Sequence, residues 1–340
     1  MTDSVISDLR SHDKGGNPSQ AIEVEGLKVH FRTSAGLVRA VDGVDLTVQN
    51  GAFHGIVGES GCGKTTLARA IVGLQSATAG HVRILGRDRA EWQRANRKGF
   101  ARSVQFIFQD PLGSMSRRQS VLQTLEEPLR IHGFGNAAER RRKVGELLDL
   151  VSLPASVLDR LPRSLSGGQR QRVSIARALA LDPRVLLCDE PLSALDVSVR
   201  AQIVNLFARL QDQLGLTIVI VAHDLAIVRE VCSAVTVMYL GRVAEEGAAR
   251  PFFADPAHPY SQALLSAVPS PDPRVEANRV PVLLEGDPPS PLNPPTGCRF
   301  STRCPVVIEA CQMTEPRLRT VQHGGRSACH LADTSGHPML

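Results

Sequence analysis

A glycine-rich segment at residues 58–66 has the residue types and the spacing needed to bind phosphate. It reads G-E-S-G-C-G-K-T-T, follows a short apolar run and precedes a stretch with the composition of a helix. Its glycines allow positive φ, so successive N–H groups can point into one concavity at a helix start. Lys64 is expected to reach the terminal phosphates of a nucleotide, and the Thr65 hydroxyl to bind Mg²⁺. The alternative, a glycine-rich turn without a ligand, is disfavoured by the order of strand, loop, lysine and hydroxyl.

A second set of polar residues follows apolar runs further along the chain. The run at 184–188 is typical of a buried parallel strand and leads into Asp189 and Glu190. An aspartate at the carboxyl end of a strand suits Mg²⁺, and the next carboxylate could polarise a water molecule. His223 ends another apolar run; a lone histidine is more often structural, but this placement favours a functional one.

The remaining pattern predicts an α/β fold around these residues. Alternating or apolar runs predict strands, and Val144, Leu147, Leu148 and Val151 have the i, i+3, i+4, i+7 spacing of an amphipathic helix. We therefore expect a mostly helical insertion at 110–164, whose basic run at 139–143 either faces solvent or contacts lipid head groups. The strands are predicted at 21–31, 44–48, 55–57, 81–85, 103–108, 184–190 and 217–221, with a hairpin at 235–245.

Composition limits the class of protein. The chain has 340 residues, of which 42% are apolar and 21% charged, which predicts one large domain with an appendage. Only 4% are aromatic and the net charge is +5, so a base-stacking nucleic-acid surface is not predicted. No run of about 18 apolar residues is present, and residues 1–20 have the composition of a disordered tail.

Cysteines divide into two groups. The odd total of seven in a chain with a nucleotide loop favours a reduced, cytosolic setting, and Cys62, Cys188 and Cys232 are expected to be buried and inert. The proline-rich region after residue 250 leads into four more, separated by five, six and seventeen residues. Four thiolates suit zinc or an iron–sulfur cluster, but the short C-x₂₋₄-C pairs usual for zinc are absent from the sequence, and unliganded thiols are the third alternative. These four are Cys298, Cys304, Cys311 and Cys329.

Taken together, the motifs resemble those of an ATP-binding-cassette (ABC) ATPase across residues 21 to about 246. Each motif alone is modest evidence, whereas all of them in this order are highly specific. They are the phosphate loop at 58–65, the Q-loop Gln109, the signature L-S-G-G-Q at 165–169, the acidic strand end at 185–190, the D-loop at 193–196 and the switch histidine His223.

A narrower resemblance is to the oligopeptide, dipeptide and nickel importer ATPases. It is carried by G-E-S-G-C-G-K, I-F-Q-D-P at 107–111, S-A-L-D-V-S at 193–198, V-M-Y-L-G at 237–241 and, in the tail, A-H-P-Y at 257–260, G-C-R-F at 297–300 and R-C-P at 303–305. Two departures are S-M-S-R-R at 114–118, where S-L-N-P-R is more usual, and His54 at a normally apolar place. Both leave the ATP motifs intact, and the first lies near the expected contact with the membrane subunits.

The resemblance implies a P-loop cassette, with a mostly parallel core sheet, an antiparallel β subdomain and a helical insertion, at 21–249. A C-terminal domain of the peptide-transporter type would follow at 250–340. ATP hydrolysis would use Glu190 as base and His223 to hold the γ-phosphate, and Thr65, Gln109 and Asp189 would organise Mg²⁺. Phe31 would stack on adenine, although its pattern fits a core strand residue equally well. The other implied nucleotide contacts are Gly58, Ser60, Gly61, Cys62, Gly63, Lys64, Thr66, Ser166, Gly168 and Gln169, and the four C-terminal cysteines are similar to those that hold a [4Fe–4S] cluster in this family.

The implied partners follow from the single set of motifs. In this family the signature binds the ATP held by the opposite subunit, so a head-to-tail dimer with an identical or related cassette is expected. Two transmembrane permease subunits and an extracytoplasmic solute-binding protein would complete a peptide importer, with this subunit peripheral at the cytoplasmic membrane face. The alternatives are an importer ATPase for nickel, glutathione or another small solute, an exporter ATPase, and a non-transport ABC protein.

Overall fold

A computed structural model of the protein describes residues 19–269, 274, 276, 282, 284–322 and 324–332. The predicted disordered tail lies outside the described residues except for Ser19 and Gln20, and Gln20 already begins the first strand. None of the helices in the described ranges has the length and hydropathy that a membrane crossing requires.

The main sheet has eight strands in the order β11-β12-β10-β9-β3-β8-β7-β6. The five strands from β9 to β6 in this order are parallel, and Phe53 to Val57 of β3 align with Ile218 to Ala222 of β8. Every residue of β3, β7 and β8 is buried, as expected for strands covered on both faces. The strands are β3 (Phe53–Val57), β6 (Val104–Ile107), β7 (Val185–Asp189), β8 (Thr217–Ala222), β9 (Ala234–Tyr239), β10 (Arg242–Ala248), β11 (Arg319–Thr320) and β12 (Arg326–Ser327).

A smaller antiparallel sheet is formed by the first two strands of the chain and a later pair. Its order is β2-β1-β4-β5, and β1 is hydrogen-bonded along most of its length to β2. The strands are β1 (Gln20–Thr33), β2 (Gly36–Gln49), β4 (Ala79–Ile84) and β5 (Arg87–Asp88). This sheet and the parallel core match the two-sheet architecture that the family resemblance implies.

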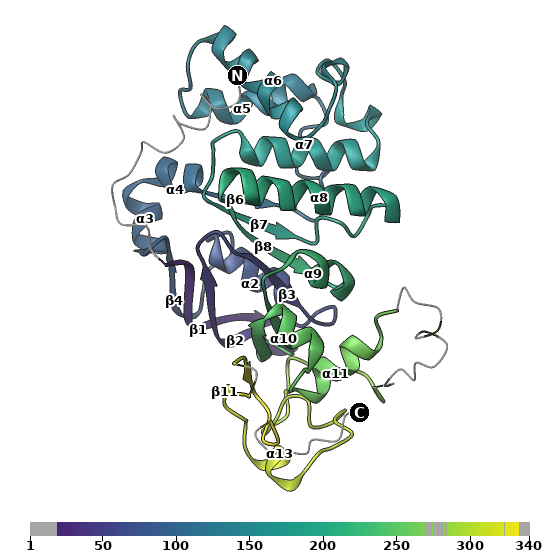
Figure 1. Ribbon diagram of the computed structural model, residues 1–340. Helices are drawn as coiled ribbons and strands as arrows, with labels where there is room; N and C mark the ends of the chain where they lie inside the picture. The colour runs from purple at the N-terminus through teal and green to yellow at the C-terminus, as the bar shows by residue number, and fades with distance from the viewer. Residues whose placement is uncertain are drawn as a thin grey trace.

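Helices cover the main sheet on both faces. Leu67 and Ile71 of α2 (Lys64–Ile71) share one hydrophobic core with alternate residues of β7, whereas Val173 of α7 (Gly167–Leu179) and Phe207 of α8 (Val197–Leu214) pack in the core of the other face. Figure 1 shows α7 and α8 above β6, β7 and β8, and α2 below these three strands. The faces alternate because successive strand residues point to opposite sides.

Helices α5 and α6 form the end of the molecule farthest from the C-terminal segments (Figure 1). Both begin with a capping box, and the predicted amphipathic stretch lies in α6, where Val144, Leu147 and Leu148 are buried. The short helices α9 and α10 were not predicted. The remaining helices are α3 (Arg89–Ala95), α4 (Arg97–Ser103), α5 (Val121–Ile131), α6 (Ala137–Leu150), α9 (Leu225–Val231), α10 (Ala249–Ala254), α11 (Pro259–Ser266) and α13 (Glu309–Met313), with 3₁₀ turns at Ala155–Val157 and Pro162–Ser164.

The C-terminal region extends the main sheet rather than standing apart from it. Ser327 of β12 pairs with Glu245 of β10, and β11 then pairs with β12. The two short strands of this polar, loop-rich region therefore join the existing sheet and do not form a sheet of their own.

His54 is the unusual polar residue of β3. Its imidazole is buried and lies 2.9 Å from the hydroxyl of Thr236 on the neighbouring strand β9. Burial lowers the pKa of His54 to about 4, so the ring is neutral at pH 7. A neutral histidine with a buried hydroxyl partner explains how the core accommodates this position.

Candidate functional site

Four neighbouring parallel strands carry the predicted site residues at one edge of the sheet. In the order β3-β8-β7-β6, they lead into the phosphate loop, His223, the pair Asp189 and Glu190, and Gln109. The carboxyl ends of adjacent parallel strands form the usual ligand-binding edge of an open α/β sheet. The topology therefore brings together residues that are far apart in the sequence: Gly58 and His223 are separated by 165 positions.

The phosphate loop is shaped by backbone that passes close on two sides. Gly58, Gly61 and Gly63 have φ angles of 147°, 78° and 105°. A Cβ on Gly58 would lie 2.2 Å from the Met238 carbonyl oxygen, and one on Gly63 would lie 2.1 Å from the Ala40 carbonyl oxygen. Glycine is thus required at both places by φ and by space.

The start of α2 is open for an anion. Gly63 occupies its N-cap position without a side-chain cap, and its first turn has no acidic residue. The amides of this turn and the helix dipole therefore favour a negative charge. Lys64 is almost fully buried and donates hydrogen bonds to the carbonyl oxygens of Gly58 (2.7 Å) and Glu59 (2.8 Å).

Asp189 lies directly beside this helix start. Its Oδ1 accepts a hydrogen bond of 2.7 Å from the Thr65 hydroxyl. Its Oδ2 is buried without a hydrogen-bond partner among the described residues, and the nearest cation is the guanidinium of Arg69 at 3.6 Å. Burial raises the pKa of Asp189, and the Thr65 hydrogen bond and Arg69 oppose that rise. A hydroxyl next to a carboxylate oxygen without a donor is the oxygen-rich set that Mg²⁺ prefers, so these two residues fit the ion.

Glu190, Gln109 and His223 meet just beyond the carboxyl end of β7. The Gln109 amide nitrogen lies 2.9 Å from Glu190 Oε2, and His223 Nδ1 lies 3.8 Å from the same oxygen. Glu190 has a φ of 44°, in the left-handed region that is uncommon for a side-chain-bearing residue and that recurs at functional sites. Its N–H donates to Val221 of β8, which holds this backbone in place.

The signature residues lie elsewhere. Ser166 is the N-cap of α7, where its hydroxyl accepts from the Gln169 N–H at 3.2 Å and the Gln169 side chain accepts from the Ser166 N–H at 3.0 Å. Gly168 packs against Val199 at the start of α8, and a Cβ there would lie 2.6 Å from that side chain. The hydrogen bonds and ion pairs known for the described residues connect none of the three to the phosphate loop.

Comparison with known proteins identifies the family. Residues 41–193 match the ABC transporter family model, and residues 244–311 match the C-terminal region of oligopeptide/dipeptide transporters. The chain is 46% identical to the oligopeptide transport ATP-binding protein OppF of Escherichia coli, over 87% of this chain and 92% of that protein. The chain belongs to the ABC transporter ATPases of the oligopeptide/dipeptide branch.

Two further similarities agree with this assignment. The putative oligopeptide transport ATP-binding protein YkfD of Bacillus subtilis is 45% identical over 91% of this chain and 95% of that protein. A solved structure of the ATP-binding cassette MJ0796, dimeric in a post-hydrolysis state bound to ADP and Pi, superposes with a TM-score of 0.62 at 30% identity, covering 67% of this chain and 99% of the other. The present ABC chain is therefore an ATPase with the cassette fold.

The structure shows where several residues expected to contact the nucleotide lie in this ABC ATPase. Phe31 is half-buried on β1 opposite Val38 and packs at the edge of a hydrophobic core. Ser60 is exposed and Thr66 half-buried in the phosphate segment, and Cys62 is buried, which raises the pKa of its thiol. Their contacts with a nucleotide stay predictions.

Burial also accounts for Cys188 and Cys232. Both thiols lie in the core, and desolvation raises the pKa of each, so neither forms a thiolate near pH 7. The expectation that these cysteines are inert is consistent with their environment.

The four C-terminal cysteines gather in one region as free thiols. The Cys298 N–H donates to the Cys311 carbonyl oxygen at 2.7 Å, and burial raises the pKa of Cys298 to about 12 and that of Cys304 to about 11. The thiols of Cys304, Cys311 and Cys329 add to the rise at Cys298. In the described part of the chain, however, no three His, Cys, Asp or Glu side chains are grouped as a metal ion requires. The arrangement does not fit a zinc ion, and the structure gives the expected iron–sulfur cluster no support.

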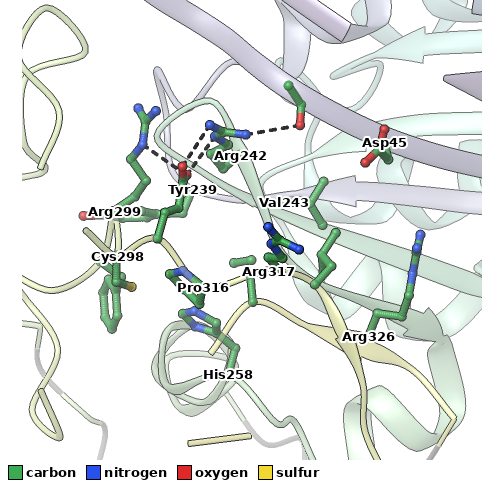
Figure 2. A pocket seen from close by; sticks show the side chains of 16 residues that line it. Asp45, Tyr239, Arg242, Val243, His258, Cys298, Arg299, Pro316, Arg317 and Arg326 are labelled. Atoms are coloured by element: carbon green, nitrogen blue, oxygen red, sulfur yellow. Dashed lines mark hydrogen bonds and ion pairs between the residues drawn. The ribbon is translucent and has the colours of Figure 1, made fainter. Parts of the chain in front are cut away.

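A cavity of about 450 Å³ lies between β9, β10 and the C-terminal region (Figure 2). Two of its arginines are paired with carboxylates: Arg242 Nε lies 2.9 Å from Glu315, and Arg299 pairs with Asp42. Burial opposes ionisation of Asp42, but the hydrogen bonds to His30 and Arg299 and the charges of Arg242 and Arg299 together outweigh it and lower the pKa of Asp42. These ion pairs help to fix the C-terminal region to the cassette.

Sequence reasoning missed three residues that reach the site. Arg69, the nearest cation to Asp189, lies one helical turn after Thr65, a spacing that could have indicated it. Tyr260 and Arg303 both contact Glu59 of the phosphate loop. They are separated from it by 201 and 244 residues, and no local pattern points to such contacts.

Proposed function

We propose that this chain is the ATP-hydrolysing subunit that energises the import of di- and oligopeptides through a membrane ABC transporter. The observation that supports it most is the edge of the main sheet, where four adjacent strands bring the phosphate loop, the two carboxylates, Gln109 and His223 together. Relatives of similar length named for oligopeptide transport support the choice of cargo class.

Nucleotide binding is assigned to the loop and the start of α2. The Lys64 ammonium now binds two loop carbonyls and would exchange them for β- and γ-phosphate oxygens. The amides from Ser60 to Thr66 would hold the same phosphates, and Phe31 would stack on adenine. Since phosphoryl transfer needs placement and charge neutralisation more than covalent chemistry, these contacts would supply most of the rate.

Mg²⁺ would be held by Thr65 and Asp189, with Gln109 close by. When bound, the ion neutralises charge on the β- and γ-phosphates. The chain contributes a hydroxyl already oriented by Asp189 Oδ1 and a second carboxylate oxygen, Oδ2, that accepts no hydrogen bond from the described residues.

Water activation is assigned to Glu190. Its carboxylate would accept a proton from the attacking water, while Gln109, 2.9 Å away, orients it and His223 contacts the γ-phosphate. The left-handed backbone of Glu190 sets its side chain apart from that of Asp189, which leaves one carboxylate for the metal and one for the water.

A second cassette would complete each site. Ser166, Gly168 and Gln169 lie on α7, on the other face of the sheet from α2, so they would serve ATP bound to a partner subunit. Val197, 80% exposed beside the D-loop, is an apolar residue suited to such an interface. The dimeric cassette MJ0796 provides the precedent. The complete importer would add two permease subunits and an extracytoplasmic solute-binding protein, and this subunit would be peripheral at the cytoplasmic face of the membrane.

The [4Fe–4S] cluster is retained only as a proposal for the four C-terminal thiols. A four-iron cluster is larger than one zinc ion, so its ligands lie farther apart than the grouping a single ion requires. Four irons per chain after anaerobic purification would support it, and an iron-free, colourless protein would remove it. No step of the mechanism depends on this group.

Glu190→Gln tests the assignment of the base. Turnover should fall by about 10²–10⁴-fold, because the amide cannot accept the proton, whereas ATP should still bind and hold two cassettes together. Hydrolysis of radiolabelled ATP and light scattering with ATP measure the two effects. Turnover at the wild-type rate would contradict the role of Glu190.

The transport function is tested by copurification and uptake. Tagged chain expressed with its cognate permeases should copurify with both membrane subunits, and proteoliposomes of this complex should take up a radiolabelled oligopeptide only with ATP. Failure to copurify with membrane subunits, together with full ATPase activity, would contradict the importer assignment.

A further inference from the structure

The second residue of the phosphate loop is held by the C-terminal region. The Glu59 N–H donates a hydrogen bond of 2.8 Å to the hydroxyl of Tyr260, and its carboxylate lies 2.8 Å from the guanidinium of Arg303. Its carbonyl oxygen accepts from Lys64 at 2.8 Å. All three polar groups of this loop residue are therefore engaged, two of them by residues that the ATP motifs do not include.

The two C-terminal partners are themselves firmly placed. Tyr260 is completely buried, with its ring centroid 4.7 Å from that of Tyr239 and 5.3 Å from that of Phe300. The side chain of Arg303 is only 8% exposed. The backbone N–H of Arg303 donates a hydrogen bond of 3.0 Å to the Phe300 carbonyl oxygen. Tyr260 thus belongs to a packed aromatic cluster, and Arg303 is hydrogen-bonded to it, so both partners of Glu59 are held in place.

We propose that Tyr260 and Arg303 are positioning residues for ATP binding, acting through Glu59; we call the three residues the loop brace. The inference rests on the proposed function, because the ligand of this loop is the ATP phosphate chain. Lys64 must leave the carbonyls of Gly58 and Glu59 to bind phosphate, and the loop then loses two of its own hydrogen bonds. The loop brace keeps the Glu59 backbone in place during this exchange, so less free energy is spent on ordering the loop when ATP binds.

The same contacts imply a reciprocal effect. If the C-terminal region raises ATP affinity through Glu59, then bound ATP must stabilise the C-terminal contacts by the same factor. Arg303 immediately precedes Cys304, so the turn at 298–304 would become more stable when ATP occupies the phosphate loop.

The test is a double-mutant cycle on ATP affinity with Glu59→Gln, Arg303→Gln and the double variant. Each single change should raise the Kd for ATP about tenfold, and the double change should add little more, because both remove the same ion pair. At saturating ATP the kcat should stay within about twofold, so the effect appears in KM, as expected for lost binding rather than lost chemistry. Tyr260→Phe, which keeps the ring, should raise the Kd by a smaller factor.

Arg326→Gln is the matched control. Arg326 pairs with Glu246 on β10, so this change also removes an ion pair between the C-terminal region and the cassette, but away from the loop. It should leave the Kd for ATP unchanged, and Arg303→Lys should restore part of the affinity lost in Arg303→Gln. An unchanged Kd in both Arg303→Gln and Tyr260→Phe would overturn the proposal, as would an equal rise in Arg326→Gln.

Hydrogen exchange provides a readout that does not depend on turnover. Adding a non-hydrolysable ATP analogue should slow amide exchange at 298–304 in the wild-type chain and not in Glu59→Gln. If the analogue binds but the exchange rate at 298–304 does not change, the proposed loop brace would also be refuted. A wild-type chain that binds no ATP would instead refute the proposed function.

Discussion

The starts of α2 and α7 follow similar glycine-containing segments but are built in opposite ways. At α2, Gly63 offers no side-chain cap and Lys64 lies over the loop, so the helix amides stay available for phosphate. At α7, Ser166 and Gln169 cap each other and already use the amides at that end. A glycine-rich helix start is therefore not in itself a phosphate site, and only α2 is prepared to bind one within a single chain.

Lys64→Ala should show the largest difference between the two helix starts in their effect on ATP binding. Removing this cation should lower ATP turnover by about 10²–10³-fold and weaken ATP binding by the isolated chain, because no other lysine lies in the loop. Arg170→Ala is the control: it removes a cation at the start of α7, where Arg170 donates to the Leu165 carbonyl, and should leave binding by the isolated chain unchanged. Equal losses in isothermal titration calorimetry would contradict the distinction.

Alanine at one glycine of each segment should have a smaller effect, on stability. Gly63→Ala places a Cβ 2.1 Å from the Ala40 carbonyl oxygen at a φ of 105° and should cost about 2–4 kcal/mol of unfolding free energy. Gly167→Ala meets only the Leu195 side chain at 3.4 Å and should change stability by about 0.5 kcal/mol or less. Urea unfolding measures the free energy of unfolding of both variants. Similar losses in the two would show that steric crowding is not the reason for glycine in the loop.

Ser166→Ala should have the smallest effect in the single chain. Loss of the cap should cost about 1 kcal/mol, and Ser166→Asn, which can still cap, should cost less. Binding of ATP by the isolated chain should be unchanged, whereas turnover of the dimer should fall, since this hydroxyl would act on the partner's nucleotide. Weaker ATP binding by isolated Ser166→Ala chains would place the signature in the chain's own site.

Local patterns predicted the strands, the loop and the helix of the phosphate-loop region well. The apolar runs of β3, β7 and β8 and the loop between β3 and α2 are continuous in sequence, so strand, loop and helix could be recognised together. The S-x-x-Q capping box of α7 is equally visible in the sequence, but sequence alone does not show whether the serine only caps its own helix or also faces a ligand.

The contacts of the C-terminal region could not be predicted in the same way. Strands β11 and β12 have two residues each, too few for any periodicity, and Tyr260 and Arg303 reach Glu59 only because the chain folds back over the cassette. Such contacts depend on tertiary packing, which leaves no regular trace in the spacing of residues.

The pairing of β12 with β10 has a consequence for how the protein is made. Glu245 of β10 is completely buried, and its carboxylate accepts hydrogen bonds from the N–H groups of Ala257 (2.8 Å) and His258 (2.9 Å). While the ribosome is still translating codon 250, this carboxylate has none of those donors and the sheet edge lacks its outer neighbour. The nascent cassette would therefore present an open strand to other chains until β12 has been translated, so stalling or premature termination after β10 should yield aggregates rather than a smaller working enzyme.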